Sequence, residues 1–390
     1  MSDPSDSMEA LVSAPGPVRF GMVGGGAGAF IGEVHRLAAR LDGTTQLVCG
    51  AFSRDASNSA ATGAALGLAP GRAYRDYAEM FALEARLPQG ERMEFVAIVT
   101  PNHMHFPVAR AALEAGFHVL SDKPATLSLA EARELRAVVA RTGLAYGLTH
   151  TYLGYPMVRE AARLVRDGAI GAVRKIYVDY VQGWLSAPDA GKQAAWRTDP
   201  ARSGPSGAMG DIGTHAHNLA EFVAGARMTE VAAELTAFVP GRRLDDDGSA
   251  LFRMEGGIRG VLNASQVCVG VENDLSIRIY GETGGLEWHH GDPASLRRTH
   301  ADRPTEILRA GQDYLGRDAR SRFRLPPGHP EGYIEAFANI YRDFAAGLRN
   351  GDAMGEATSS GINEAVRGMA FVEAVVESST HGGRWTAVEP

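Results

Sequence analysis

Two stretches of this sequence bring together the side chains that proton transfer needs. Asp211 and His215 stand four residues apart, and Lys123 stands between Asp122 and Pro124 earlier in the chain. Residues four apart share one face of a helix, so the carboxylate of Asp211 can orient the imidazole of His215. With an ammonium group nearby, this set predicts removal of a proton from a carbinol while a hydride leaves. Each residue alone has a structural alternative: a helix N-cap, a buried histidine or a solvated lysine.

A glycine-rich segment, Val23 to Gly32, joins the first predicted strand to the first predicted helix. Glycines in such a turn allow a tight bend and close approach of the backbone to a pyrophosphate, which the helix N-terminus attracts. This context predicts a dinucleotide site, and the alternative is a flexible turn. The cofactor contacts expected in this segment are Gly24, Gly26, Ala29, Phe30 and Ile31.

The residues after the second predicted strand bear on the form of the cofactor. An acidic residue there binds the ribose 2′-hydroxyl of NAD, whereas an arginine accommodates the 2′-phosphate of NADP. The chain carries Ser53 and Arg54 at this point, which favours NADP. Asp55 follows directly and keeps NAD open as the alternative.

Other candidate contacts lie at the ends of later strands, where ligands bind to parallel sheets. Further cofactor contacts are expected from Thr100, Pro101, Asn102, His105, Asp122, Lys123, Trp196 and Arg197. Candidates for binding substrate hydroxyls are His150, Tyr152, Tyr180, Gln182 and His329, each of which has a structural alternative. The histidine pairs lack zinc spacing with carboxylate or thiolate partners, so no metal is predicted.

At 390 residues the chain is long enough for two domains. We expect a disordered leader over 1–17, a dinucleotide-binding Rossmann domain over 18–149, and a substrate and oligomerisation domain over 150–390. Strands and helices alternate in the first part, as in a parallel α/β sheet. The later strands, from 174 to 290, alternate in polarity and predict an open antiparallel sheet laid down as a meander. The segment 291–330 has no periodicity and is expected to be a loop, and helices are expected over 333–348 and 360–379.

Charge and cysteine content exclude several classes of partner. The net charge of −7 argues against nucleic acid and anionic membranes. No apolar run is long enough to span a bilayer. Cys49 and Cys268 are too few for a disulfide framework and fit buried thiols. The leader lacks the pattern of a signal peptide, so we expect a cytoplasmic protein.

Taken in order, these motifs resemble the glucose–fructose oxidoreductase / inositol dehydrogenase / MocA family. The stretches that carry the resemblance are the glycine turn, Thr100-Pro101-Asn102, Asp122-Lys123-Pro124, Trp196-Arg197 and Gly210-Asp211-Ile212-Gly213-Thr214-His215. The runs Gly270–Asn273, Gly281–Trp288 and Gly328–Tyr333 are similar to those of members that act on inositols and levoglucosan. The chain departs from the family in three ways: a glycine loop two residues longer, Asp122 in place of glutamate, and His150 where asparagine is frequent.

The resemblance implies an α/β Rossmann domain followed by an α+β domain with a large open, mainly antiparallel sheet. It also implies that Lys123, Asp211 and His215 surround the carbon that gives or receives the hydride. The expected activity is an NAD(P)-dependent oxidation of a secondary hydroxyl of a cyclic polyol or sugar to a ketone. The alternatives are a redox-assisted glycoside hydrolase and a non-catalytic dinucleotide-binding sensor. Broad sheets of this kind are commonly covered by another subunit, so we expect a homodimer or homotetramer.

Overall fold

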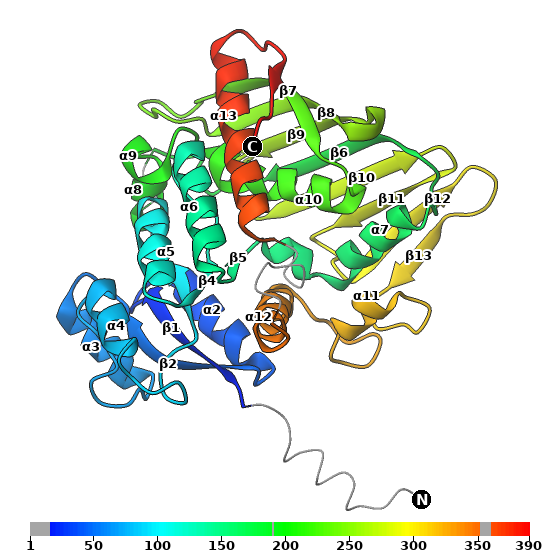
Figure 1. Cartoon of the computed structure of the whole chain (residues 1–390). Helices are drawn as coiled ribbons and strands as arrows, with labels where there is room; N and C mark the ends of the chain where they lie inside the picture. The colour runs from blue at the N-terminus through cyan, green and yellow to red at the C-terminus, as the bar shows by residue number, and fades with distance from the viewer. Residues whose placement is uncertain (1–15, 189–190, 352–359) are drawn as a thin grey trace, which may run out of the picture.

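The computed structural model describes residues 16–188, 191–351 and 360–390, and it contains two β-sheets (Figure 1). The predicted leader over 1–17 lies outside the described residues except for its last two. Within the described residues, no helix is both long and apolar enough to cross a membrane.

The first sheet is parallel and has the strand order β2-β1-β3-β4-β5. Its strands are β1 (Val18–Gly24), β2 (Thr45–Ala51), β3 (Phe95–Val99), β4 (His118–Ser121) and β5 (Tyr146–Leu148). Its helices are α2 (Phe30–Leu41), α3 (Ala56–Ala65), α4 (Tyr77–Glu84), α5 (His105–Glu114) and α6 (Leu129–Thr142). All five residues of β3 are buried, because a central parallel strand is covered on both faces. The predicted Rossmann fold is confirmed, and α4 is an additional helix that the sequence pattern did not indicate.

A helix from the end of the chain completes the core of this sheet. Helix α12 (Tyr333–Arg349) places Phe337, Tyr341 and Phe344 in the same buried cluster as Phe20 and Phe95. These three positions repeat at helical spacing and form one apolar stripe. The first core therefore depends on residues more than two hundred positions away in the sequence.

The second sheet has nine strands in the order β13-β12-β11-β10-β6-β9-β8-β7-β14. Its strands are β6 (Val173–Val181), β7 (Met228–Thr236), β8 (Asp247–Met254), β9 (Arg259–Ser265), β10 (Asp274–Gly281), β11 (Gly284–His289), β12 (Ser295–His300), β13 (Glu306–Arg309) and β14 (Thr386–Ala387). The predicted large, mainly antiparallel sheet is confirmed, but the predicted meander is wrong. Strand β6 lies between β10 and β9 and pairs with β9 in parallel, which makes the sheet mixed.

The segment 291–330 is also more ordered than its sequence suggested. It contains strand β12, the edge strand β13 that pairs with it, and a short helix, α11 (Arg317–Ser321). The arginines of β12 and β13 stand at exposed or half-buried positions, so the charges interrupt the alternation that would have revealed the strands.

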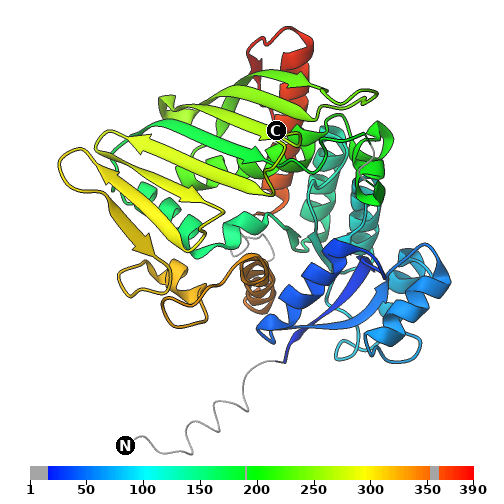
Figure 2. The same ribbon diagram turned by 180° about the vertical axis from the view of Figure 1, so that it is seen from behind.

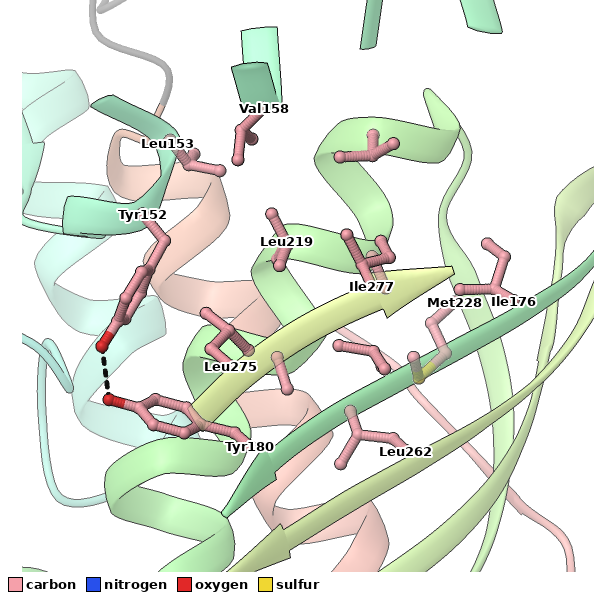
Figure 3. Packing of buried hydrophobic residues seen from close by; sticks show 14 of the residues in the cluster. Tyr152, Leu153, Val158, Ile176, Tyr180, Leu219, Met228, Leu262, Leu275 and Ile277 are labelled. Atoms are coloured by element: carbon pink, nitrogen blue, oxygen red, sulfur yellow. Dashed lines mark hydrogen bonds between the residues drawn. The ribbon is translucent and has the colours of Figure 1, made fainter. Parts of the chain in front are cut away.

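Helices cover one face of the nine-stranded sheet, and these are α7 (Pro156–Arg166), α10 (Thr214–Ala224) and α13 (Ile362–Thr380) (Figure 1). Alternate strand residues such as Ile176, Leu262 and Ile277 pack beneath them with Leu219 (Figure 3). Figure 2 shows the other face, over which no helix of the described chain lies.

Candidate functional site

The catalytic candidates meet between the two sheets. Lys123 follows strand β4, and Asp211 lies in a single π-helical turn, η3 (Met209–Gly213), that leads into α10. The Lys123 ammonium donates hydrogen bonds to Asp211 Oδ1 at 2.7 Å and to the Asp211 carbonyl at 2.6 Å. The two side chains are only 14% and 13% exposed, so the charge pair is largely shielded from water. The structure thus joins two motifs that lie far apart in the sequence.

The other carboxylate oxygen of Asp211 has two further donors. Arg197 Nε lies 3.2 Å and Gln266 Nε2 lies 2.9 Å from Asp211 Oδ2. Burial raises the pKa of Asp211, but the charges of Lys123 and Arg197 outweigh it and hold the pKa well below its usual value. Gln266 is 2% exposed and was not among the candidates from the sequence.

Within the described residues, His215 donates no hydrogen bond to the Asp211 carboxylate, so the predicted orientation of the imidazole by Asp211 is not seen. Among the described residues, the Asp211 carboxylate bonds to Lys123, Arg197 and Gln266, while His215 Nδ1 is buried without a partner. The π-helical turn places an extra residue in the winding between Asp211 and His215, so the spacing of four does not give the contact that a regular α-helix would. Asp211 therefore orients Lys123 rather than the imidazole.

A half-buried carboxylate fixes the start of this π-helical turn. Asp245, in the connection from β7 to β8, accepts hydrogen bonds from Ser206 Oγ, Gly207 N and Met209 N at 2.7–2.9 Å. These bonds satisfy backbone N–H groups that a helix start leaves without partners. A β-carbon on Gly207 would lie 2.0 Å from the Asp245 carbonyl, so only glycine permits this approach.

His215 lies in an aromatic enclosure. Its ring centroid is 5.1 Å from that of Tyr152, 5.5 Å from His150 and 6.0 Å from Tyr180. Burial lowers the pKa of His215 well below its usual value, Lys123 and His150 lower it further, and Asp211 opposes them. The imidazole is therefore neutral at physiological pH and able to accept a proton.

A hydrogen-bonded chain extends from the tyrosines of this enclosure. The Tyr152 and Tyr180 hydroxyls bond to each other (Figure 3), and Asn273 bonds to both. Gln182 Nε2 donates to Asn273 Oδ1 at 2.6 Å, and Trp184 Nε1 donates to Gln182 Oε1 at 2.9 Å. Three predicted substrate candidates, Tyr152, Tyr180 and Gln182, are thus in one network, together with two residues that were not predicted to act.

Arg197 is held by aromatic rings as well as by Asp211. Its guanidinium carbon lies 4.3 Å from the centroid of the Trp196 ring and 5.6 Å from that of Trp184. Stacking of this kind fixes the plane of a guanidinium group. The predicted pair Trp196-Arg197 is therefore brought to the Asp211 carboxylate.

The glycine turn has the geometry that a dinucleotide needs. Gly24, Gly25 and Gly28 have φ values of 86°, 71° and 80°, which favour glycine. A β-carbon on Gly32 would lie 2.3 Å from the Gly25 α-carbon, so this glycine lets α2 pack against the turn. No side chain of the described residues caps α2 at Ala29, which suits its first backbone N–H groups to a phosphate.

Three residues lie shortly after β2: Ser53 and Arg54 are candidates for contact with the cofactor, and Asp55 caps a helix. Ser53 is half-buried and Arg54 is exposed. Asp55 is the N-cap of α3, and its carboxylate accepts hydrogen bonds from Ser57 N, Asn58 N and Ser57 Oγ. The carboxylate that kept NAD open in the sequence is therefore committed to the helix.

The loop after β3 holds two predicted residues through internal contacts. Asn102 Nδ2 donates to the Ser203 carbonyl at 3.1 Å, and the ring nitrogens of His105 lie 2.6 Å and 2.8 Å from the Pro124 and Thr100 carbonyls. His105 thus ties the loop after β3 to the loop that carries Lys123, and its polar atoms are not directed at a cofactor. Thr100 Oγ1 is a buried polar atom without a partner among the described residues, as expected where a ligand completes the site.

Asp122 connects the lysine loop to the nucleotide-binding helix. Its Oδ1 accepts from Lys123 N and from Thr149 Oγ1, each at 2.9 Å. Its Oδ2 lies 3.9 Å from Nε2 of the buried His35, whose Nδ1 is 2.7 Å from the Tyr341 hydroxyl. Burial lowers the pKa of His35 to about 4, so this imidazole is neutral.

His329 stands apart from the other candidates. It is exposed, its Nδ1 lies 2.9 Å from the Pro326 carbonyl, and within the described chain it contacts none of the site residues named above.

The residues that sequence reasoning missed are Gln266, Asn273, Trp184 and Asp245. Asn273 ends one of the motif runs quoted for the resemblance, and that run is the signal that pointed toward it.

Both the fold and the site define a dinucleotide-dependent oxidoreductase. A Rossmann sheet carries a glycine turn suited to binding a phosphate, and a lysine bonded to an ionised aspartate acts on the pKa of a neutral histidine. The chain belongs to the GFO/IDH/MocA oxidoreductase family. The family's NAD-binding Rossmann profile matches residues 18–150, and its C-terminal domain profile matches residues 158–287.

Several relatives place the chain within this family. An uncharacterised oxidoreductase of Bacillus subtilis, YfiI, is 32% identical over 97% of this chain and 98% of its own length. An inositol dehydrogenase homolog of Azotobacter vinelandii, solved in complex with NAD+, is 35% identical with a TM-score of 0.92 over 96% of this chain and 98% of that one. The same homolog has been solved with NADH and myo-inositol. Levoglucosan dehydrogenase of Pseudarthrobacter phenanthrenivorans is 25% identical over 73% of this chain and 78% of its own.

Proposed function

We propose that this protein is an NAD(P)-dependent dehydrogenase that oxidises a secondary hydroxyl of a cyclic polyol or sugar to a ketone. The observation that carries the proposal is the contact of Lys123 with Asp211 beside the neutral imidazole of His215. A bound nicotinamide supplies the acceptor for the hydride. The residues of the chain then have to bind the substrate oxygen, remove its proton and exclude water.

Lys123 is suited to polarise the reacting oxygen. A protonated lysine has three N–H groups, and two of them are directed at Asp211. The third is left for the oxygen at the reacting carbon. The ionised carboxylate of Asp211 holds the ammonium in place, and Lys123, Arg197 and Gln266 keep the pKa of the carboxylate low.

His215 is assigned the acid–base role. Its ring is neutral and has no partner at Nδ1 in the part of the chain that the structure describes, so it accepts the hydroxyl proton as the hydride leaves and returns it in the reverse reaction. Changing His215 to Asn should lower kcat while leaving the affinity for the cofactor unchanged. Equal kcat in this variant and the wild-type enzyme contradicts the assignment.

A cyclic polyol or sugar is the substrate class that the surroundings favour. Gln182, Asn273 and Trp184 form a chain of amide and indole groups beside the tyrosines, and such groups recognise several hydroxyls on one ring. The structure of a homolog with myo-inositol supports the same class. A panel of inositols, levoglucosan and pyranoses, followed by the formation of reduced nicotinamide, tests the proposal.

NADP is proposed to bind at least as well as NAD. Arg54 is exposed beside the expected ribose, and Asp55 is engaged at the N-cap of α3 rather than turned toward the cofactor. Burial lowers the pKa of His103, and the charges of Arg202 and Arg54 lower it further while Asp199 opposes them, so both arginines act on the loop after β3. The structures of the inositol dehydrogenase homolog with NAD+ and with NADH favour NAD as the cofactor instead. Comparing kcat/KM for the two cofactors distinguishes them, and a strong preference for NAD refutes this part of the proposal.

A homodimer or homotetramer packed through the open sheet face is proposed as the assembly. That face carries large side chains, with Leu251 51% and Tyr280 37% exposed and Tyr177 packed edge-on against Tyr280. Apolar and aromatic side chains on a broad flat face favour covering by a second subunit. Light scattering after size-exclusion chromatography measures the mass, and a monomer at micromolar concentration contradicts this assembly.

The cytoplasm is the proposed location, in keeping with the free thiols of Cys49 and Cys268.

A further inference from the structure

His150 lies at the edge of the proposed catalytic site, where its ring makes a buried hydrogen bond. It follows strand β5, is 3% exposed, and has its Nδ1 2.6 Å from Ser360 Oγ. Ser360 is itself 4% exposed, and its carbonyl accepts a hydrogen bond from Leu148 N at 2.9 Å. The serine is therefore fixed to the strand that precedes the histidine.

The contact with Ser360 determines which ring nitrogen of His150 carries the proton. Burial, assisted by the charges of Lys123 and His217, lowers the pKa of His150 to about 3, so the ring has one N–H. Within the described residues, His150 Nδ1 is the partner of the Ser360 hydroxyl. A buried hydroxyl hydrogen requires an acceptor, so Ser360 donates to Nδ1 and the ring proton resides on Nε2.

His150 borders the space in which the reaction is proposed to occur. Its ring lies edge-on to that of His215, with 5.5 Å between the centroids. The charge of Lys123 acts on both imidazoles, which places His150 near the ammonium as well. A neutral N–H at this position differs from the ammonium of Lys123 because it donates a hydrogen bond without adding charge.

We propose that His150 is a further catalytic residue, which donates its Nε2–H to the oxygen of the reacting carbon, and that Ser360 is the positioning residue that fixes this tautomer. The inference rests on the proposed dehydrogenase function. During oxidation the hydroxyl proton goes to His215, the hydride leaves the carbon, and His150 keeps its own proton throughout. Lys123 and His150 then provide two donors for the negative charge that develops on the oxygen. A neutral histidine that acts as a hydrogen-bond donor is an established way to polarise a carbonyl group.

The tautomer is tested first, by nitrogen NMR of the full-length protein labelled with 15N-histidine. The signals that His150→Leu removes identify the residue. We expect His150 to be neutral, with its proton on Nε2, in the wild-type protein near neutral pH. A proton on Nδ1, or a doubly protonated ring, overturns the proposal. This measurement needs no substrate, so its outcome is independent of the proposed function.

Turnover of whichever polyol the panel identifies tests the catalytic role. We expect His150→Leu to lower kcat by roughly 10²-fold, as loss of one donor to a developing oxyanion does. Ser360→Ala should lower kcat by about 10-fold, and Ser360→Thr, which keeps the hydroxyl, should restore it to within about threefold. Ser378→Ala is the matched control, since Ser378 is also fully buried but bonds to Ala233 N and the Arg384 carbonyl. Its kcat should equal that of the wild-type enzyme.

The measurements distinguish failure of the roles given to His150 and Ser360 from failure of the proposed dehydrogenase function. Wild-type kcat in His150→Leu overturns the catalytic role of His150, and equal losses in Ser360→Ala and Ser360→Thr overturn the role of the serine hydroxyl. Absence of turnover by the wild-type enzyme with every polyol instead refutes the proposed function, and the NMR measurement still tests the tautomer.

Discussion

Replacing His150 by asparagine is expected to make the protein less sensitive to acid. His150 is buried, and its pKa is lowered from 6.5 to about 3 in the folded protein. Below pH 6.5 the unfolded chain takes up a proton at this residue that the folded protein does not. The folded-state pKa is the depressed one, so the contribution of the neutral imidazole to stability is present above the unfolded pKa and is lost as pH falls.

The size of the effect follows from these two pKa values. Between about pH 7 and about pH 4.5, linkage gives a loss of about 2.5 kcal/mol in the free energy of unfolding from His150 alone. Asparagine does not titrate, so His150→Asn should lose about that much less than the wild-type protein over the same range. Comparing the change with pH removes any constant effect of the substitution on packing.

The assay is urea denaturation followed by tryptophan fluorescence at both pH values, with the slope of the denaturation curve checked for constancy. His329→Asn is the matched control, because His329 is exposed. We expect this control to keep the pH dependence of the wild-type protein. The same pH dependence in His150→Asn and the wild-type protein refutes the conclusion that the folded protein holds a neutral, shielded imidazole at this position.

Three further predictions concern activity. Lys123→Ala should lower kcat by roughly 10²- to 10⁴-fold, far more than it weakens cofactor binding, measured by steady-state rates and by titration of the bound nucleotide; unchanged turnover removes the lysine from the mechanism. Gln266→Leu keeps the size of the side chain but removes a donor to Asp211, so kcat should fall by about 10-fold or more, and an unaltered kcat shows that Lys123 and Arg197 suffice. Ser53→Asp should shift the ratio of kcat/KM values from NADP toward NAD, because a carboxylate binds the ribose diol and repels the phosphate; no shift places the ribose elsewhere.

The sequence predicts those strands, helices and turns that depend on residues close together in the chain. The buried run of β3 and the glycine turn before α2 depend on short-range periodicity and backbone conformation, and the structure contains both. The parallel position of β6 between β10 and β9 could not be predicted, because pairing of strands distant in sequence leaves no local signal. The strands within 291–330 were missed because their arginines interrupt the alternation.

In the site, too, local motifs could be predicted from the sequence, but contacts between distant residues could not. Lys123 and Asp211 were identified by motif, but the π-helical turn changed the partner of Asp211 from His215 to the lysine. Gln266 could not be assigned, since a glutamine that follows a strand has no chemical signature until the fold brings it to a carboxylate. Ser360 is likewise an ordinary serine in the sequence and becomes informative through its contact with His150.

The most direct test of the account is a rate measurement on the purified protein. Each cofactor, NAD+ and NADP+, is mixed with each member of a panel of inositols, levoglucosan and pyranoses, and reduced nicotinamide and ketone are measured together. The account predicts that at least one cyclic polyol or sugar gives equal amounts of the two products, and that Lys123→Ala does not. Cleavage of a glycoside without net formation of reduced nicotinamide, or tight cofactor binding without turnover of any member, contradicts it.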